Sequence, residues 1–268
     1  MTDAIPSPVA ARFVGQSVNR KEDHRLLTGH GQYVDDVVLP GMLHGAFVRS
    51  DFARANIVGI DTSAALDLPG VVAVYTWQDF HERFGEAYHA MLGEELVVPP
   101  PLAITDVRHV GDPVVFVVAT SRYVAEDACD LIEVDYEPMP AAPDYRTALD
   151  DEAVVHSAWG LQSNAMVAMP FESLSSDLDE AFEQAAHVVE TTVEQNRYVC
   201  VPMETRGIIA DWHPGRDEMD IVCSTQGVHE ARNFFARYLG RLFHELTAIV
   251  GAEASTRRTF FGIAVTSL

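Results

Sequence analysis

Cysteine is scarce in this chain, and no two cysteines have the spacing of a metal or redox motif. The 268 residues contain three, Cys129, Cys200 and Cys223, and no C-x-x-C pair occurs. An odd, scattered set argues against a disulfide framework. Zinc and iron–sulfur sites need clustered thiolates, so neither is expected. This cysteine usage fits a reducing cytoplasm best.

Basic residues and long apolar runs are also few. The sequence has 18 Lys and Arg against 40 Asp and Glu, which gives a formal net charge of −22. Nucleic-acid binding relies on a basic surface, so no nucleic-acid partner is expected. The longest wholly apolar run covers residues 114–119. A bilayer span needs about 20 residues, so no membrane span is expected.

The short motifs of several common chemistries are missing as well. Three His-Glu pairs begin at His81, His229 and His244, and none has the second histidine four residues later that a zinc-protease helix requires. Gly29-His30-Gly31 begins like a dinucleotide fingerprint, but Val34 stands where its third glycine would be. Neither a phosphate-binding loop nor a nucleophile-elbow motif occurs. These absences argue against zinc protease, NTPase and triad-hydrolase functions.

Apolar segments in the first half predict strands around one helix. Residues 114–119 are apolar on both faces, as is typical of a central strand, and residues 133–136 are expected at a sheet edge. Between them, Val124, Ala128 and Leu131 recur at helical spacing. Further strands are predicted at residues 43–49, 56–61 and 71–76.

Three prolines within residues 137–146 mark the clearest domain boundary. Beyond it, Asp177 is a good N-cap for a helix, and an alternating strand is predicted over residues 188–194. The expected buried face of that helix consists of Phe182, Ala185, Ala186 and Val189.

A second strand, residues 219–225, leads into a helix that ends at Gly240. The expected buried face of this helix consists of Ala231, Phe234, Phe235, Tyr238 and Leu239. Strands and helices are mixed without strict alternation, so the predicted fold class is α+β.

A few polar residues stand out as candidates for chemistry. Gln226 lies where the predicted strand gives way to the helix, a junction that projects polar groups into clefts, although turn glutamines often only bond their own loop. The adjacent Asp35 and Asp36 point in different directions, so turn and surface roles are favoured over a shared site. Glu204 sits in an otherwise apolar segment, and a structural ion pair with Arg197 or Arg206 is its expected role.

Several longer segments together resemble one family. VGQSVNRKED at residues 14–23 and RLLTGHGQYVDD at 25–36 resemble the opening of the large subunit of xanthine dehydrogenase, aldehyde oxidase and carbon monoxide dehydrogenase-type enzymes. VDYEPMPA at 134–141 looks like the close of that family's α/β hammerhead domain. PME at 202–204 and STQGVH at 224–229 are similar to the start of its molybdopterin-binding domain.

The resemblance implies a domain organisation. A flexible leader is expected at residues 1–12, followed by an α/β hammerhead domain at 13–142. The truncated start of a molybdopterin-binding domain follows at 143–240, and a divergent tail occupies 241–268.

The resemblance also implies a function. Family members hydroxylate aldehydes or heterocycles with oxygen from water, or oxidise carbon monoxide, at a molybdenum–molybdopterin centre. Partner subunits with iron–sulfur clusters and FAD carry the electrons away. By the match at residues 224–226, Gln226 resembles the family's glutamine whose amide donates a hydrogen bond to a molybdenum oxo ligand.

The chain departs from the family after residue 240. Family large subunits are several-fold longer, and the glycine-rich cofactor loop expected after the last helix is missing, as is the catalytic glutamate near the family's C-terminus. A frameshift or truncation near residue 240 would explain this. The expected product is a portion that binds no cofactor alone and is inactive, and whether it is itself an enzyme stays open. The alternatives are a non-catalytic docking module for iron–sulfur or flavin subunits, and one piece of a split large subunit.

Overall fold

The computed structural model describes most of the chain. Its described residues are 17, 19–21, 23–82, 100–150, 152–157, 161–165, 178–196, 201–202, 204–239, 246–250 and 261–266. The predicted leader at 1–12, the N-cap Asp177 and the helix stop Gly240 lie outside these residues.

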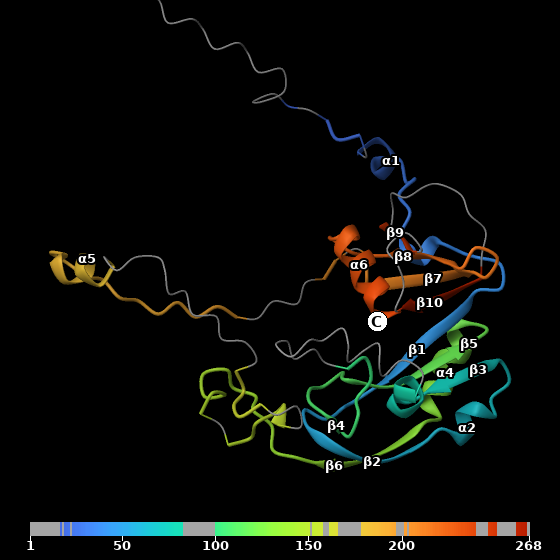
Figure 1. Ribbon diagram of the computed structural model, residues 1–268, viewed down its shortest axis with the longest axis horizontal. Coiled ribbons are helices and arrows are strands. Elements are labelled where there is room, and N and C mark those ends of the chain that lie inside the picture. The colour runs from blue at the N-terminus through green and yellow to red at the C-terminus, as the bar shows by residue number, and fades with distance from the viewer. Residues whose placement is uncertain are drawn as a thin grey trace, which may run out of the picture.

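One large mixed sheet runs through the molecule in the strand order β3-β5-β1-β10-β7-β8-β9 (Figure 1). The pairs β1–β10 and β8–β9 are parallel, and the other neighbours are antiparallel. The strands are β1 (Leu43–Arg49), β3 (Val71–Tyr75), β5 (Pro113–Ala119), β7 (Gly207–His213), β8 (Glu218–Cys223), β9 (Leu246–Val250) and β10 (Phe261–Thr266).

The first unit of the chain contains β1 to β6, and its core is built on β5. Val114, Val115 and Val117 are 0% exposed, which confirms the prediction of a central strand from its apolar pattern. Helix α4 (Arg122–Asp130) packs on β1 and β5 and buries Ala125 and Ala128. The helix begins where the Ser121 hydroxyl accepts a hydrogen bond from the Val124 N–H at 3.2 Å, a regular N-cap.

A smaller sheet of three strands has the order β4-β2-β6. Its strands are β2 (Ala55–Asp61), β4 (Asp106–Val107) and β6 (Glu133–Pro138), with the short helix α2 (Ser63–Leu66) after β2. The predicted edge position of β6 is confirmed. Its exposed side chains Glu133, Asp135 and Glu137 are acidic, which discourages pairing of this edge with another strand.

The second unit is a hairpin of β7 and β8 covered by helix α6 (Val228–Tyr238). Phe235 and Leu239 pack against Ile221 and Cys223, as the sequence predicts. Ala236, which lies outside the predicted face, is also in this core, whereas Phe234 is 45% exposed. The true buried face is therefore rotated from the predicted one.

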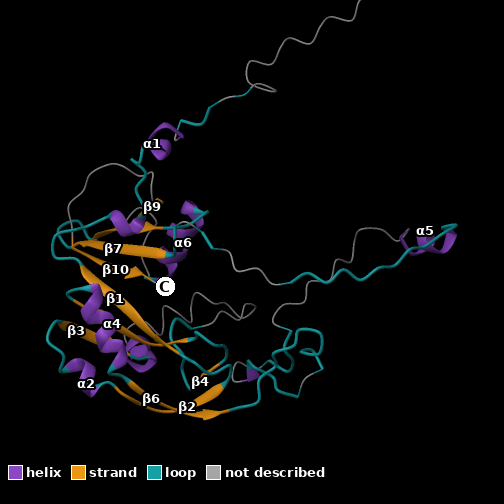
Figure 2. Cartoon of the chain, turned by 180° about the vertical axis from the view of Figure 1, so that it is seen from behind, coloured by secondary structure: helices purple, strands orange, loops and turns teal. Residues whose placement is uncertain are grey.

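Helix α5 (Leu178–Gln184) forms as predicted, but its predicted buried face is wrong. Phe182 is 58% exposed and Val189 89% exposed. The strand predicted over residues 188–194 is also wrong, since no described strand pairs with it. Both views show α5 standing away from the two sheets (Figures 1 and 2). The apolar residues of α5 share one side of the helix, as the sequence predicts, but no described residue covers that side.

The N-terminal segment joins the two units. It contains α1 (Asp23–Leu27) and the 3-10 helix η1 (Val34–Asp36), and the predicted turns around residues 26–36 are present. Val34 is 3% exposed and packs with Ile209 of β7, and an added Cβ at Gly207 would lie 3.0 Å from the Val34 Cγ1. Only glycine allows this close approach without displacement of its neighbour.

Two strands lie in the region expected to be a divergent tail. β9 pairs with β8, and β10 lies between β1 and β7 in the large sheet. Local pattern could not predict the pairing of β10 with β1 and β7, because both partners are distant in sequence.

Candidate cofactor-contact site

The turn between β8 and α6 is held by hydroxyl side chains. The Ser224 hydroxyl accepts from the Gly207 N–H at 3.1 Å and donates to the Thr205 carbonyl at 3.2 Å. The Thr225 hydroxyl accepts from the Gly227 N–H at 3.2 Å. Thr225 therefore holds the turn by a hydrogen bond within it, and Ser224 holds it to Thr205 and to Gly207 at the start of β7.

Gln226 is the exposed residue of this turn. Within the part of the chain that the structure describes, its amide makes no hydrogen bond. The alternative role, a glutamine that bonds its own loop, is therefore not seen, because Ser224 and Thr225 perform that bonding. The structure leaves one primary amide projecting from a rigid strand–helix junction.

Gly227 is the N-cap residue of α6. An added Cβ at Gly227 would lie 2.6 Å from a Glu230 carboxylate oxygen, so any larger residue would displace that side chain. Glu230 lies in the first turn of α6, where a negative charge interacts favourably with the helix dipole. The Ala231 N–H donates to the Gly227 carbonyl at 2.9 Å and closes the first helical turn.

Glu204 directly precedes Thr205, whose carbonyl accepts the Ser224 hydrogen bond, but the Glu204 carboxylate makes a contact elsewhere. Its carboxylate accepts the Val34 N–H at 3.1 Å, which fixes the N-terminal segment onto the start of the second unit. This backbone contact is the role that the described residues show for Glu204, and Arg197, one of its two expected ion-pair partners, lies outside those residues. Asp36 accepts the Tyr33 N–H at 2.8 Å and Asp35 pairs with Arg122, so the two carboxylates point apart as predicted.

A buried carboxylate on the hairpin has no counterpart in the sequence predictions. Asp211 is 3% exposed, and neither of its oxygens has a hydrogen-bond partner among the described residues. It lies opposite Asp220 across the β7–β8 ladder. The His213 Nε2 is 3.1 Å from the Asp220 Oδ2 and 3.9 Å from the Asp211 Oδ2. Burial raises the pKa of Asp211 to about 6, although His213 acts in the opposite direction.

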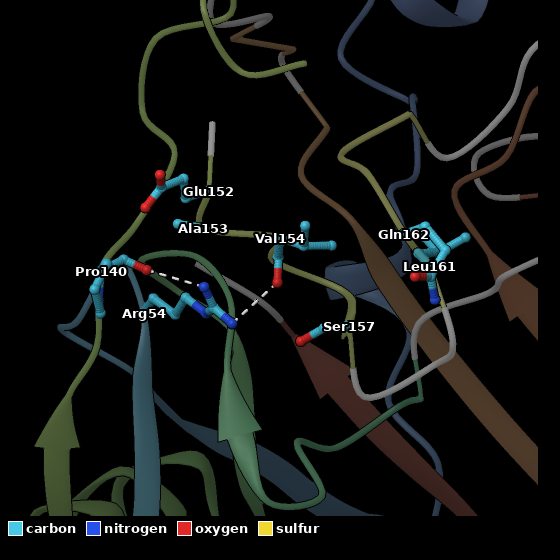
Figure 3. A pocket seen from close by; sticks show the side chains of 8 residues that line it. All are labelled: Arg54, Pro140, Glu152, Ala153, Val154, Ser157, Leu161 and Gln162. Carbon is cyan, nitrogen blue, oxygen red and sulfur yellow. Dashed lines mark hydrogen bonds between the residues drawn. The ribbon is translucent and has the colours of Figure 1, made fainter. Parts of the chain in front are cut away.

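An open cleft of about 700 Å³ lies between the first unit and the segment that follows β6. Arg54 forms its base and donates to the Pro140 and Val154 carbonyls, each at 3.0 Å (Figure 3). Its walls carry Glu152 and Ser157. The Arg54 guanidinium thus binds the segment that follows β6 to the first unit. The residues that line the cleft do not form a cluster of reactive groups.

Among the described residues, the side chain suited to contact a molybdenum cofactor is that of Gln226. A free primary amide, such as that of Gln226, can donate to a metal-bound oxygen. No group of three or more His, Cys, Asp or Glu able to hold a metal ion occurs among the described residues. Cys129 and Cys223 are free thiols. His81 and His229 are exposed and lie on different units, so the His-Glu pairs form no common site, and His244 lies outside the described residues.

Two family models match this chain. The a/b hammerhead domain of aldehyde oxidase and xanthine dehydrogenase matches residues 28–140, and the molybdopterin cofactor-binding domain matches residues 162–252. The second match includes the Gln226 turn and runs past residue 240, where the resemblance was expected to stop.

Known proteins agree with these matches over most of the chain. The nicotine 6-hydroxylase large subunit of Paenarthrobacter nicotinovorans is 40% identical over 87% of this chain and 28% of its own length. The carbon monoxide dehydrogenase large chain of Afipia carboxidovorans is 34% identical over 90% of this chain and 31% of its own. The crystal structure of quinoline 2-oxidoreductase from Pseudomonas putida 86 superposes with a TM-score of 0.76 at 31% identity, covering 95% of this chain and 34% of that one.

The chain thus spans about 28% of the length of the nicotine 6-hydroxylase large subunit. None of the helices within the described residues is long and apolar enough to cross a bilayer. Both domains occur here in the order expected from the sequence, the hammerhead domain first and the cofactor-binding domain second. The chain belongs to the xanthine dehydrogenase, aldehyde oxidase and carbon monoxide dehydrogenase family and corresponds to the N-terminal portion of its molybdopterin-binding large subunit.

Proposed function

We propose that this chain supplies the first part of the large subunit of a molybdenum-dependent hydroxylase, in which Gln226 contacts the metal centre. The observation that carries the proposal is the exposed, unengaged amide of Gln226 on a turn fixed by Ser224 and Thr225. The cofactor would supply the redox chemistry and the activated oxygen. The protein's own contribution here is one oriented hydrogen-bond donor.

We propose a nitrogen heterocycle as the substrate class of the complete enzyme. Support comes from the names of two similar proteins, a nicotine 6-hydroxylase and a quinoline 2-oxidoreductase, which are 40% and 31% identical to this chain. Within the sequence comparison the carbon monoxide dehydrogenase large chain is 34% identical, against 40% for the nicotine 6-hydroxylase subunit. Within the structure comparison the reconstituted CO dehydrogenase of Oligotropha carboxidovorans is 28% identical, against 31% for the quinoline enzyme. Hydroxylation of a ring carbon is therefore favoured over oxidation of carbon monoxide.

We further propose that the isolated chain is inactive and holds no cofactor, and that iron–sulfur and FAD subunits accept its electrons in the complete assembly. A single amide cannot retain a pterin cofactor. Relatives are named as the large subunit or large chain of their enzymes, which supports a multi-subunit assembly. The free thiols of Cys129 and Cys223 support a cytoplasmic location.

A chimera tests the role of Gln226. Residues of this chain would replace the matched 235-residue region of the nicotine 6-hydroxylase large subunit, co-expressed with that enzyme's other subunits. Gln226→Ala should leave the molybdenum content unchanged, shift the Mo(V) electron paramagnetic resonance signal and lower turnover about 10–100-fold, the usual effect of losing a ligand-orienting contact. Gln32→Ala, at an exposed glutamine of the N-terminal segment, is the matched control. Identical spectra and rates for the two variants would reject the assignment.

A further inference from the structure

The four residues that lead into β7 are held on one side by the N-terminal segment. We call these residues, 204–207, the bracket. The Val34 N–H donates to the Glu204 carboxylate at 3.1 Å. The Val34 side chain packs beside Gly207, where an added Cβ would lie 3.0 Å from the Val34 Cγ1. Because Val34 is 3% exposed, water has little access to either contact.

The bracket is held on its other side by the turn between β8 and α6. The Ser224 hydroxyl donates to the Thr205 carbonyl and accepts from the Gly207 N–H. The Ser224 N–H donates to the Gly207 carbonyl at 3.2 Å. These three hydrogen bonds join the bracket to the residue two positions before Gln226. A shift of the bracket therefore displaces the turn that carries Gln226.

The N-terminal segment is attached in turn to the first unit. Asp35, next to Val34 in the chain, pairs with Arg122 at the start of α4. Both side chains are partly exposed, so this pair guides position more than it adds stability. The Tyr33 N–H donates to the Asp36 carboxylate at 2.8 Å and closes η1 around Val34. Val34 thus reaches Glu204 from a short helical turn tied to the first unit.

The Glu204 carboxylate is the side-chain group on which this connection depends. A hydrogen bond to a charged acceptor is stronger than one between neutral groups. Removal of the carboxylate would leave the buried Val34 N–H without its acceptor, which costs more than the bond itself contributes. The N-terminal segment would then shift to bring this N–H to water, and Val34 would move away from Gly207. The bracket would lose both of its contacts on that side.

A displaced turn matters for the chemistry because a hydrogen bond depends on distance and angle. Misplacement of a group at a reaction centre by about 1 Å can cost about 100-fold in rate. Given the proposed contact of Gln226 with the metal centre, on which this inference rests, we propose that Glu204 is a positioning residue for Gln226. Glu204 acts through the bracket and Ser224, and its role requires no contact with cofactor or substrate.

Double-mutant kinetics in the chimera with the nicotine 6-hydroxylase large subunit test this role. Glu204→Ala should leave the molybdenum content and KM unchanged, alter the Mo(V) electron paramagnetic resonance signal and lower kcat about tenfold. Glu204→Gln keeps an acceptor oxygen for the Val34 N–H and should restore kcat to within about threefold of the parent. In a Gln226→Ala background, Glu204→Ala should change kcat less than about twofold, because the group that it positions is already absent. Glu133→Ala, at an exposed glutamate of β6, is the matched control.

Amide hydrogen exchange in the 268-residue chain tests the physical link without the cofactor. Glu204→Ala should speed exchange of the Val34 N–H, its direct partner, about tenfold or more. The Gly207 and Gly227 N–H groups, which donate to hydroxyls of the turn, should also exchange faster. Glu133→Ala should change none of the three.

Several results would overturn the proposal. Equal fractional losses of kcat from Glu204→Ala in the parent and in the Gln226→Ala background would show two independent effects, as a purely structural role predicts. Faster exchange at Val34 alone would show that the bracket does not act on the turn. If Glu204→Ala does not assemble, Ser224→Ala removes the other side of the bracket, and an effect of that variant independent of Gln226 would equally count against positioning.

The kinetics also separate this inference from the one on which it rests. An unchanged kcat in Glu204→Ala, with Gln226→Ala impaired, would refute the positioning role and leave the Gln226 assignment intact. An unchanged kcat in Gln226→Ala would refute the metal-centre contact itself, and the positioning role with it.

Discussion

Replacement of Asp211 by asparagine should stabilise this protein at neutral pH and have little effect near pH 4. The carboxylate is 3% exposed and has no hydrogen-bond partner among the described residues. Burial raises its pKa from 3.8 to about 6. Because the folded pKa is above the unfolded one, the carboxyl favours the folded state while it is protonated, and that contribution is lost as the pH rises through about 6.

The size of the effect follows from the shift. A change from 3.8 to about 6 corresponds to a difference of about 3 kcal/mol in the free energy of unfolding between the two ends of the titration. The amide introduced by Asp211→Asn does not titrate in either state. The stability difference between this variant and the parent should therefore grow by about 1.4 kcal/mol per pH unit between pH 4 and 6. Above that range the difference should level off.

Urea unfolding measures this difference directly. Trp212 is adjacent to Asp211 on β7, so it adds a fluorescence signal from this hairpin to the signals of the other two tryptophans. Asp217→Asn, which removes one charge from the exposed turn of the same hairpin, is the control for the loss of a charge alone. A constant difference between Asp211→Asn and the parent from pH 4 to 7.5 would refute the reasoning, because a structural effect of the amide alone would not follow the titration.

Two further predictions concern packing and reactivity. Gly207→Ala should cost about 1–3 kcal/mol in unfolding free energy, because the new Cβ would lie 3.0 Å from the Val34 Cγ1. Gly215→Ala, where nothing lies within 4 Å, should be neutral in the same denaturation assay. Burial raises the pKa of Cys129 to about 11, so iodoacetamide at pH 8 should alkylate it about 100-fold more slowly in the folded chain than in urea. Equal rates in the two conditions would contradict its burial.

Local pattern was sufficient where the apolar pattern of a strand or helix is strong. The run Val114 to Ala119 predicted the central strand β5, and the spacing of Val124 and Ala128 predicted α4. Both belong to the first unit, in which β5 and α4 follow directly and the core lies between them. The strand β7 was missed because Asp211 and His213 place polar groups on its buried face and break the expected alternation.

The pairing of strands that are distant in sequence was beyond such reasoning. β10 pairs with β1 and β7, and neither pairing leaves a mark in the sequence of residues 261–266. Helix α5 shows the converse, since its amphipathic pattern is clear but Phe182 within that pattern is 58% exposed. For the site, the position of Gln226 at a strand–helix junction was predicted. The bonds from Ser224 to Thr205 and Gly207, which fix that junction, could only come from the structure.

Molybdenum analysis of the purified 268-residue chain tests the central claim most directly. The protein would be produced in a host that makes the molybdopterin cofactor, both alone and with the C-terminal portion of the nicotine 6-hydroxylase large subunit. The account predicts no molybdenum in the isolated chain, and about one atom per complex when the second portion is present. Stoichiometric molybdenum in the isolated chain would contradict it, because a complete cofactor site would then exist within these residues.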